Sequence, residues 1–262
     1  MKPTTDASDL AAGAAFVPTM GALHEGHLSL IRAAKKWNVP VVVSIFVNPT
    51  QFAPGEDFEA YPRPLERDLQ LLEAEGVDFA FVPEVRSIYP SDQTCWSPPL
   101  PSVAHEPKLE DAHRPHFFAG VCAVVSRLFD LVQPHHTFFG EKDWQQLQVV
   151  RAMVKETGRW PELKVHPVPT MRSASGLALS SRNAYLSSAD LHAAESLNRA
   201  LQHAADGEGA MRAILEDAGC EIDYAVIRDA DTLMHPQSNR PRRALVAATV
   251  SETRLIDNAS VD

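Results

Sequence analysis

The sequence predicts an α/β fold, in which a doubly wound parallel sheet is followed by a smaller α+β domain. Apolar, β-branched runs such as residues 39–47 are typical of strands that are buried on both faces. These runs alternate with amphipathic helical segments such as residues 65–75, which favours a parallel sheet with crossover helices. From about Met171 the pattern changes to a loop rich in Ser, Gly and Arg, so we divide the chain into residues 1–170 and 171–262.

In the first part, strands and helices are expected to alternate. Residues 1–13 are mostly small and polar, which predicts a frayed or weakly helical arm. Residues 86–116 are rich in proline and polar groups and predict an excursion from the sheet. The spacing of apolar residues predicts strands at 16–17, 39–47, 77–83, 137–140 and 163–168, and helices at 28–34, 65–75, 120–131 and 145–150.

The second part has the pattern of a small α+β unit. Helices are expected at about 188–205 and 209–218. Residues 223–227, 244–250 and 254–257 have the composition of strands, and we expect long loops between them.

Composition excludes several classes of protein. The net charge of −10 disfavours nonspecific binding to nucleic acid. No apolar run approaches the roughly 18 residues of a membrane span, and the first residues lack the apolar stretch of a signal peptide, so we expect a cytoplasmic protein. Cys95, Cys122 and Cys220 are far apart and lack zinc or redox spacing, so we interpret them as reduced and structural.

The most informative stretch is residues 16–27, a short strand that breaks at Pro18 and re-enters a helix at His24-Glu25-Gly26-His27. A helix start offers unpaired backbone N–H groups and a positive dipole end, which suit an anion. His24 and His27 would share one face, and Gly26 would let a phosphate approach the backbone. Alone, the motif is equally compatible with a helix start that carries two surface histidines.

Three further polar stretches follow predicted strands or the loop after them, on the edge of the sheet where α/β proteins bind ligands. They are residues 48–52, 140–146 and 175–183. Taken singly, each is compatible with a polar turn or a helix-capping loop. Their combination on one edge favours a site for nucleotide phosphates.

Together these stretches resemble the pantothenate synthetase family. The segment 18–27 is similar to the family's His-x-Gly-His signature, which many nucleotidyltransferases share, and 44–52 is similar to its substrate loop. Segments 139–147, 176–183, 227–233 and 254–258 continue the resemblance, which covers about residues 14–260. The resemblance implies a Rossmann-like nucleotidyltransferase domain at 1–170 and a C-terminal lid domain at 171–262.

The resemblance also implies a two-step reaction without a covalent enzyme intermediate. The carboxylate of pantoate attacks the α-phosphorus of ATP to give pantoyl adenylate and pyrophosphate, and the amine of β-alanine then displaces AMP. Magnesium is expected on the phosphates, held mostly by them and by water, with Asp143 as a direct or indirect contributor and no protein metal cage. A homodimer formed through the larger domain is a further expectation from the resemblance, and neither nucleic acid nor a membrane is an expected partner.

The resemblance assigns the residues as follows. His27 acts as the acid or proton donor, His24 binds phosphate beside it, and Lys142 and Arg182 complete the catalytic group, with positive charge from all four side chains at the leaving pyrophosphate. Gln51 and Gln146 bind pantoate, and Gln51 also binds β-alanine. The ATP site comprises Met20, Gly21, Ala22, Leu23, His24, Glu25, Gly26, His27, Gly140, Glu141, Lys142, Asp143, Met171, Leu179, Ser180, Ser181 and Arg182.

Several positions depart from the family pattern, among them Arg127, which stands for a common lysine, His116 and Ser175. His116 stands where a glycine is usual, so it either narrows the substrate loop or points to solvent. Ser175 replaces an aspartate before Gly176, which bears on the rigidity of the loop on the ATP side. Two alternative functions stay open: an enzyme that adenylates another acid or transfers a nucleotide, and a nucleotide-binding protein without catalysis.

Overall fold

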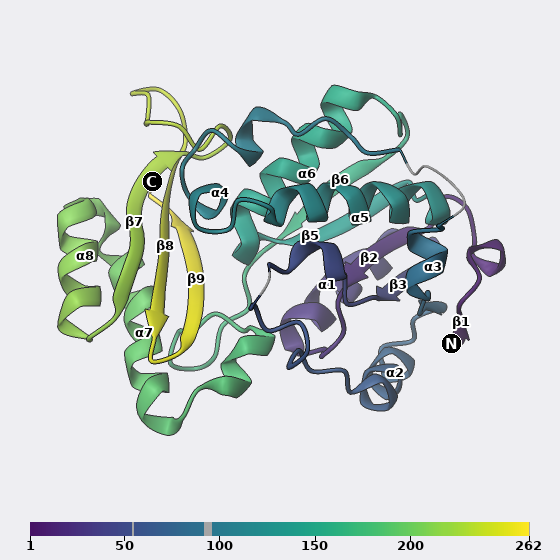
Figure 1. Ribbon diagram of the computed structural model, residues 1–262, viewed down its shortest axis with the longest axis horizontal. Coiled ribbons are helices and arrows are strands. Elements are labelled where there is room, and N and C mark those ends of the chain that lie inside the picture. Colours follow the sequence, from purple (N-terminus) through teal and green to yellow (C-terminus); the bar gives the residue numbers. More distant parts are fainter. Residues whose placement is uncertain (54, 92–95, 262) are drawn as a thin grey trace.

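The computed structural model describes residues 1–53, 55–91 and 96–261. Within them, the chain forms a six-stranded sheet flanked by helices and a separate three-stranded sheet with two helices beside it (Figure 1). The expected α/β architecture with a smaller α+β unit is therefore confirmed. Cys95 lies outside the described residues, whereas Cys122 and Cys220 are buried free thiols.

The large sheet is parallel throughout and has the order β1-β4-β3-β2-β5-β6. From β2 the chain builds β3 and β4 on one side and then crosses to β5 and β6 on the other. The strand order therefore reverses between β2 and β5, where such sheets open a crevice for ligands. The strands are β1 (Lys2–Thr4), β2 (Ala15–Thr19), β3 (Val41–Ile45), β4 (Phe79–Phe81), β5 (His136–Gly140) and β6 (Lys164–Val168).

Helices cover both faces of this sheet. Val17 and Val43 pack with α1 (Glu25–Lys35) and α2 (Leu65–Ala74), whereas Phe16 and Val42 pack on the opposite face. That second face is covered by α5 (Phe117–Val132) and α6 (Trp144–Thr157). Since successive strand residues point to opposite faces, burial on both sides explains why the strands read as continuous apolar runs.

The first residues differ from expectation. Lys2–Thr4 is neither frayed nor helical but forms β1, which pairs in parallel with β4 at the edge of the sheet. A single 3₁₀ turn, Ala7–Asp9, follows, with the Asp6 side chain accepting from the backbone N–H of Ser8. The strand was not predicted because its residues are mostly polar. A strand at the edge of a sheet can expose its side chains to solvent while its backbone still forms hydrogen bonds with the neighbouring strand.

The excursion expected at residues 86–116 is confirmed among the described residues. It contains only short pieces, α3 (Val85–Ile88) and α4 (Glu110–His113), with a 3₁₀ turn at Ser102–Ala104 between them. These pieces place Glu110, His113 and Arg114 beside the crevice.

The small unit begins with α7 (Ser188–Gln202) and α8 (Glu208–Asp217) and continues with the antiparallel sheet β7-β8-β9. On β8, Val246 and Ala248 pack against the two helices, whereas Leu245 and Ala247 join the core of the large unit. The small sheet is thus buried on both faces. Its strands are β7 (Glu221–Asp229), β8 (Arg242–Val250) and β9 (Thr253–Ser260).

The expectation of long loops between these strands holds only for β7 and β8. Between β8 and β9 it is wrong, because Val250 pairs with Thr253 and the turn is only two residues long. Ser251 adopts a positive φ of 54° there, the conformation that tight hairpins need. The first of the two expected helices, at about 188–205, is shorter than expected: α7 ends at Gln202, and a 3₁₀ turn at Ala204–Asp206 follows.

Candidate active site

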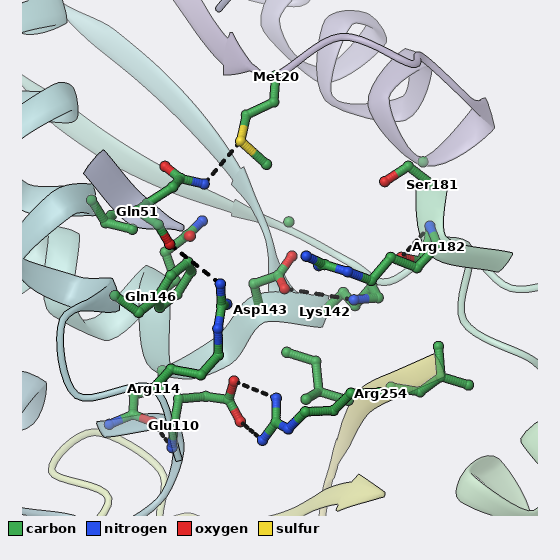
Figure 2. Close-up of a pocket in the computed structure, with 18 of the residues that line it drawn as sticks. Met20, Gln51, Glu110, Arg114, Lys142, Asp143, Gln146, Ser181, Arg182 and Arg254 are labelled. Atoms are coloured by element: carbon green, nitrogen blue, oxygen red, sulfur yellow. Dashed lines mark hydrogen bonds and ion pairs between the residues drawn. The ribbon is translucent and has the colours of Figure 1, made fainter. Parts of the chain in front are cut away.

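A cavity of about 860 Å³ lies at the carboxyl ends of β2 and β5 and is closed on one side by the small unit. In Figure 2, Met20, Gln51 and Gln146 lie on one side of it and Ser181 and Arg182 on the other. The sequence-predicted residues that line the cavity are Met20, His24, Gly26, His27, Gln51, Gly140, Lys142, Asp143, Gln146, Met171, Leu179, Ser180, Ser181 and Arg182. The predicted residues that do not line it are Gly21, Ala22, Leu23, Glu25 and Glu141.

His24 and His27 cap the start of α1 reciprocally. Nδ1 of His24 accepts the backbone N–H of Gly26 at 3.1 Å, and Nδ1 of His27 accepts that of His24 at 3.3 Å. An accepting Nδ1 carries no proton, so each neutral ring bears its proton on Nε2. The ring centroids are 4.1 Å apart.

Both histidines are neutral in the free protein. Burial, followed by the charge of Lys142, lowers the pKa of His24 to about 4. Burial, followed by His24 and Lys142, lowers the pKa of His27 to about 3. In the free protein the pair therefore offers hydrogen-bond donors rather than positive charge.

Gly26 leaves space for the ring of His24. A Cβ on Gly26 would lie 2.8 Å from Cε1 and 2.9 Å from Nδ1 of His24, so the missing side chain makes room for the His24 ring. The glycine sets the orientation of the histidine.

Several backbone donors near the start of α1 already have partners. Asp68, a carboxylate only 1% exposed, accepts the N–H of Ala22 at 2.8 Å and that of Leu23 at 2.9 Å. The N–H of His27 bonds the carbonyl of His24. Gly21 and Ala22 adopt positive φ values of 79° and 49°, and Asp68 thus stabilises a sharp turn from β2 into α1.

Asp68 was not predicted from the sequence, although a signal existed. It stands four residues before the buried Leu72, on the apolar face of α2, where a carboxylate needs a hydrogen-bonding partner.

Lys142 and Arg182 are two of the cationic side chains that line the cavity, and each has a carboxylate beside it. Nζ of Lys142 lies 3.6 Å from Oδ1 of Asp143, and Nη2 of Arg182 lies 3.0 Å from Oδ1 of Asp57. Burial opposes the charge on Arg182, but the pairing with Asp57 outweighs it and raises the pKa of the guanidinium. Both side chains line the cavity and are within reach of an anion there.

Gln51 is held in place by its own turn. Its Oε1 accepts from Nδ2 of Asn48 at 3.2 Å, and its Nε2 lies 2.8 Å from the sulfur of Met20. Asn48 is 1% exposed and also donates to the carbonyl of Gly120 at 3.2 Å. Sequence reasoning assigned Gln51 but missed this buried amide beneath it.

Gly120 allows α5 to approach the turn that carries Gln51. A Cβ on Gly120 would lie 2.4 Å from the carbonyl oxygen of Thr50 and 2.8 Å from Cα of Gln51. Any larger residue would push the turn away, so this glycine fixes the depth of Gln51 in the cavity.

Arg114 supports the same side of the site from the excursion. It pairs with Glu56 at 2.9 and 2.8 Å and donates to the carbonyl of Gln51 at 3.3 Å. Its guanidinium also lies over the ring of Phe117, 3.9 Å from the centroid. The neighbouring His116 is exposed and does not line the cavity, so it does not narrow the substrate loop.

The loop on the ATP side is ordered without the aspartate that Ser175 replaces. Ser175 Oγ lies 2.8 Å from Ser173 Oγ, which accepts the N–H of Leu177 at 3.1 Å. Arg172 donates to the carbonyl of Gly176 at 3.1 Å and pairs with Asp257 through two bonds of 2.6 and 3.0 Å. The ion pair with Asp257 supplies the support that the sequence alone left in question.

Among the described residues, no group of three or more His, Cys, Asp or Glu side chains is arranged to hold a metal ion. Asp143 is a carboxylate in the cavity beside Lys142, and its side chain is half-exposed. This donor set fits a cation that is held mainly by phosphate oxygens and water rather than by a protein cage.

Comparison with known proteins decides the family. The family model described as pantoate-beta-alanine ligase matches residues 3–260. The chain belongs to the pantoate-beta-alanine ligase family. A curated relative from Nocardia farcinica, named pantothenate synthetase, is 45% identical over 256 residues, which covers 94% of this chain and 79% of the relative. Another with the same name, from Mycobacterium sp. strain KMS, is 48% identical over 257 residues, covering 94% and 80%.

Solved structures of family members have the same fold. A crystal structure of pantothenate synthetase from Thermus thermophilus matches with a TM-score of 0.93 and 42% identity, covering 100% of this chain and 99% of that one. A pantoate-beta-alanine ligase from Francisella tularensis, solved in complex with β-γ ATP and β-alanine, matches with a TM-score of 0.83 and 34% identity, covering 99% and 97%. The resemblance inferred from the sequence motifs is therefore confirmed.

Proposed function

We infer that this chain catalyses the ATP-dependent condensation of pantoate with β-alanine to pantothenate, releasing AMP and pyrophosphate. One observation carries the inference: a single cavity brings His24, His27, Lys142 and Arg182 together with Gln51 and Gln146, in a chain that belongs to the ligase family over residues 3–260. The ligands named for the Francisella tularensis relative, ATP and β-alanine, support it.

The phosphates of ATP belong at the cationic end of the cavity. Lys142 and Arg182 attract them, and the Nε2–H groups of His24 and His27 donate to them as neutral groups. As the bond to the α-phosphorus breaks, negative charge accumulates on pyrophosphate, where these donors stabilise it more than in the ground state. Met171 and residues 179–182, which are also predicted ATP contacts, line the same space.

The acid that is activated belongs at the amide end. Gln51 and Gln146 hydrogen-bond the hydroxyls and carboxylate of pantoate, and Gln51 also contacts β-alanine. Neutral amides orient a carboxylate without the strong charge neutralisation that an arginine would impose, so the oxygen keeps its nucleophilicity. Apolar side chains of Phe118, Val121 and Phe139 complete this side of the wall.

The two steps follow from this arrangement. A carboxylate oxygen of pantoate attacks the α-phosphorus, the bond to the bridging oxygen breaks, and pyrophosphate leaves with the electron pair. The unprotonated amine of β-alanine then attacks the acyl carbon, AMP leaves, and the amine loses a proton as the amide forms. No side chain becomes covalently attached at either step.

Mg²⁺ enters with ATP as part of the substrate. It screens the phosphate charge during pyrophosphate departure, and Asp143 is placed to contact it directly or through water. The half-exposed carboxylate of Asp143, beside Lys142 in the cavity, supports this assignment.

We propose that residues 171–262 act as a lid over ATP on the domain at 1–170. The pairing of Arg182 with Asp57, at 3.0 Å, bridges the two parts across the mouth of the cavity. Hydrogen exchange in residues 176–183 is expected to slow when ATP binds. Exchange that ATP leaves unchanged would refute the lid.

Three further expectations concern the whole molecule. No helix within the described residues is long and apolar enough to cross a membrane. We propose a cytoplasmic location from the composition of the sequence. On the family resemblance alone, we propose a homodimer formed through the larger domain. Sedimentation equilibrium of the purified chain tests the dimer, and a monomeric mass at micromolar concentration would exclude it.

Purified protein supplied with ATP, Mg²⁺, pantoate and β-alanine tests the function by the release of AMP. Pyrophosphate release should require pantoate but not β-alanine in a single turnover. Equal activity with other acids would favour a different adenylating enzyme. Well-folded protein that forms no AMP would favour a nucleotide-binding protein without catalysis.

A further inference from the structure

Asn258, near the end of β9, contacts the turn that carries Lys142. Its Nδ2 donates to the carbonyl oxygens of Glu141 at 2.9 Å and of Lys142 at 2.8 Å, across 117 and 116 residues of sequence. Its side chain is buried, with the residue 3% exposed. One amide therefore uses both of its hydrogens on two consecutive carbonyls of the catalytic turn.

The remaining atom of this amide fixes its orientation. Oδ1 of Asn258 accepts from Nε of Arg243 at 2.6 Å, and Nη2 of Arg243 bonds Oε2 of Glu141 at 3.1 Å. Reversing the amide would set oxygen against two carbonyls and NH₂ against a guanidinium. Charge and hydrogen-bond type therefore allow only the observed orientation.

The turn receives no comparable support from its own sequence. Glu141–Asp143 is a single 3₁₀ turn, and neither Gly140 at its start nor Asp143 at the start of α6 provides a side-chain cap. Gly140 also adds no side-chain packing at the end of β5. The position of the Lys142 backbone thus depends on contacts from the small unit.

The same end of β9 also holds the loop on the ATP side. Asp257, the residue before Asn258, is 3% exposed and pairs with Arg172, which also donates to the carbonyl of Gly176. Two adjacent residues of β9 therefore reach two separate segments of the phosphate site.

We propose that Asn258 is a positioning residue, which sets Lys142 against the phosphates of ATP by holding the carbonyls of the 141–142 turn. This proposal rests on the proposed function, because Lys142 is the group through which Asn258 acts. A carboxylate at this position has nearly the same shape but no hydrogens to donate. It would repel both carbonyls and pair with Arg243 alone.

A double-mutant cycle tests the proposal. Asn258→Asp is expected to slow pantoate-dependent pyrophosphate release about 10- to 100-fold, because small misplacements of a catalytic group have effects of this size. In a Lys142→Ala background the same substitution is expected to change the residual rate less than about twofold, since the ammonium group through which Asn258 acts is absent. Equal losses in the two backgrounds would overturn the proposal.

Controls separate positioning from general damage. Tyr224→Phe removes another hydrogen bond between the two units, 2.7 Å to Oε1 of Glu110, and its effect should add to that of Lys142→Ala. If both substitutions were non-additive with Lys142→Ala, the coupling would be general and the specific role of Asn258 would be refuted. Asn258→Ser, which is smaller and keeps one donor, replaces Asn258→Asp if that variant does not fold.

A second readout separates this proposal from the proposed function. The same cycle is measured by calorimetric binding of a non-hydrolysable ATP analogue. Wild-type protein that releases no pyrophosphate would contradict the proposed function, whereas additive losses of analogue affinity would contradict the positioning role.

Discussion

His24 and His27 are joined through their own backbone: Nδ1 of His27 accepts the N–H of His24 at 3.3 Å, while the His24 ring accepts the N–H of Gly26. In each ring, Nδ1 accepts a backbone N–H at the start of α1. The Nε2–H of each ring is therefore left to donate to another group. The motif therefore builds two neutral donors side by side, in a place where two imidazolium ions would repel each other.

The depressed pKa values predict that acid destabilises the protein. His27 has a pKa of about 3 when folded, compared with about 6.5 when unfolded, so the unfolded state binds more protons below pH 6.5. The free energy of unfolding should fall as the pH falls from about 6.5 toward 3 and change little from this source above 6.5. Between pH 6.5 and 4.5, denaturant titrations should show wild type losing about 2 kcal/mol more than His27→Gln. Parallel curves for the two proteins would contradict the assignment.

Removal of the Lys142 ammonium should slow the first step without unfolding the protein. Lys142→Ala is expected to lower the rate of pyrophosphate release by about 10²- to 10³-fold, because a donor to the transition state is lost. Lys155→Ala is the matched control, since Lys155 is exposed on the helix that follows and does not line the cavity. Near-normal turnover by Lys142→Ala would exclude its proposed role.

Gly120→Ala should damage the acid-binding side selectively. The new Cβ would lie 2.4 Å from the Thr50 carbonyl, so the turn that holds Gln51 must shift. We expect a loss of about 1–3 kcal/mol in the free energy of unfolding and a larger rise in KM for pantoate than for ATP. Gly209→Ala on α8 is the control, because a Cβ there meets no atom within 4 Å and alanine favours a helix. Equal changes in the two KM values would argue against selective displacement of Gln51.

Asp57→Asn should strengthen ATP binding. In the free protein Asp57 holds Arg182 at 3.0 Å, and the phosphates must compete with that carboxylate. We expect the Kd for ATP to fall about three- to tenfold, consistent with the small net value of a partly exposed ion pair. Asp217→Asn, on an exposed position of α8, removes the same charge at a distance and should leave the Kd unchanged. Weaker ATP binding by Asp57→Asn would instead assign the carboxylate a favourable role in the complex.

Much of the fold could be predicted from the sequence because the patterns that indicate its strands and helices are local. Residues 39–47 predicted a doubly buried strand, and β3 is that strand. The early residues were misread because pairing of Lys2–Thr4 with Phe79–Phe81 depends on an edge that sequence spacing does not reveal. The two-residue turn at Ser251 was missed for a related reason, since the register of β8 with β9 sets its length.

In the candidate site, too, the residues of local motifs were predicted from the sequence, whereas their distant partners were not. Local motifs identified His24, His27, Lys142 and Arg182, and all four line one cavity. The motifs did not reveal what holds them, because Asp68 and Asn258 are buried partners that lie far away in the sequence.

By itself, the sequence determined most of the alternation of strands and helices from β2 onward, the family, and the chemical groups at the carboxyl edge of the sheet. Only the tertiary structure decided the charge, the hydrogen-bond partners and the orientation of these groups. Burial makes the histidines neutral, Asp68 occupies the backbone donors of the turn before α1, and Asn258 sets the turn of Lys142. The physical reason is that charge state and side-chain orientation depend on desolvation and on partners brought together by folding, and neither is encoded in local spacing.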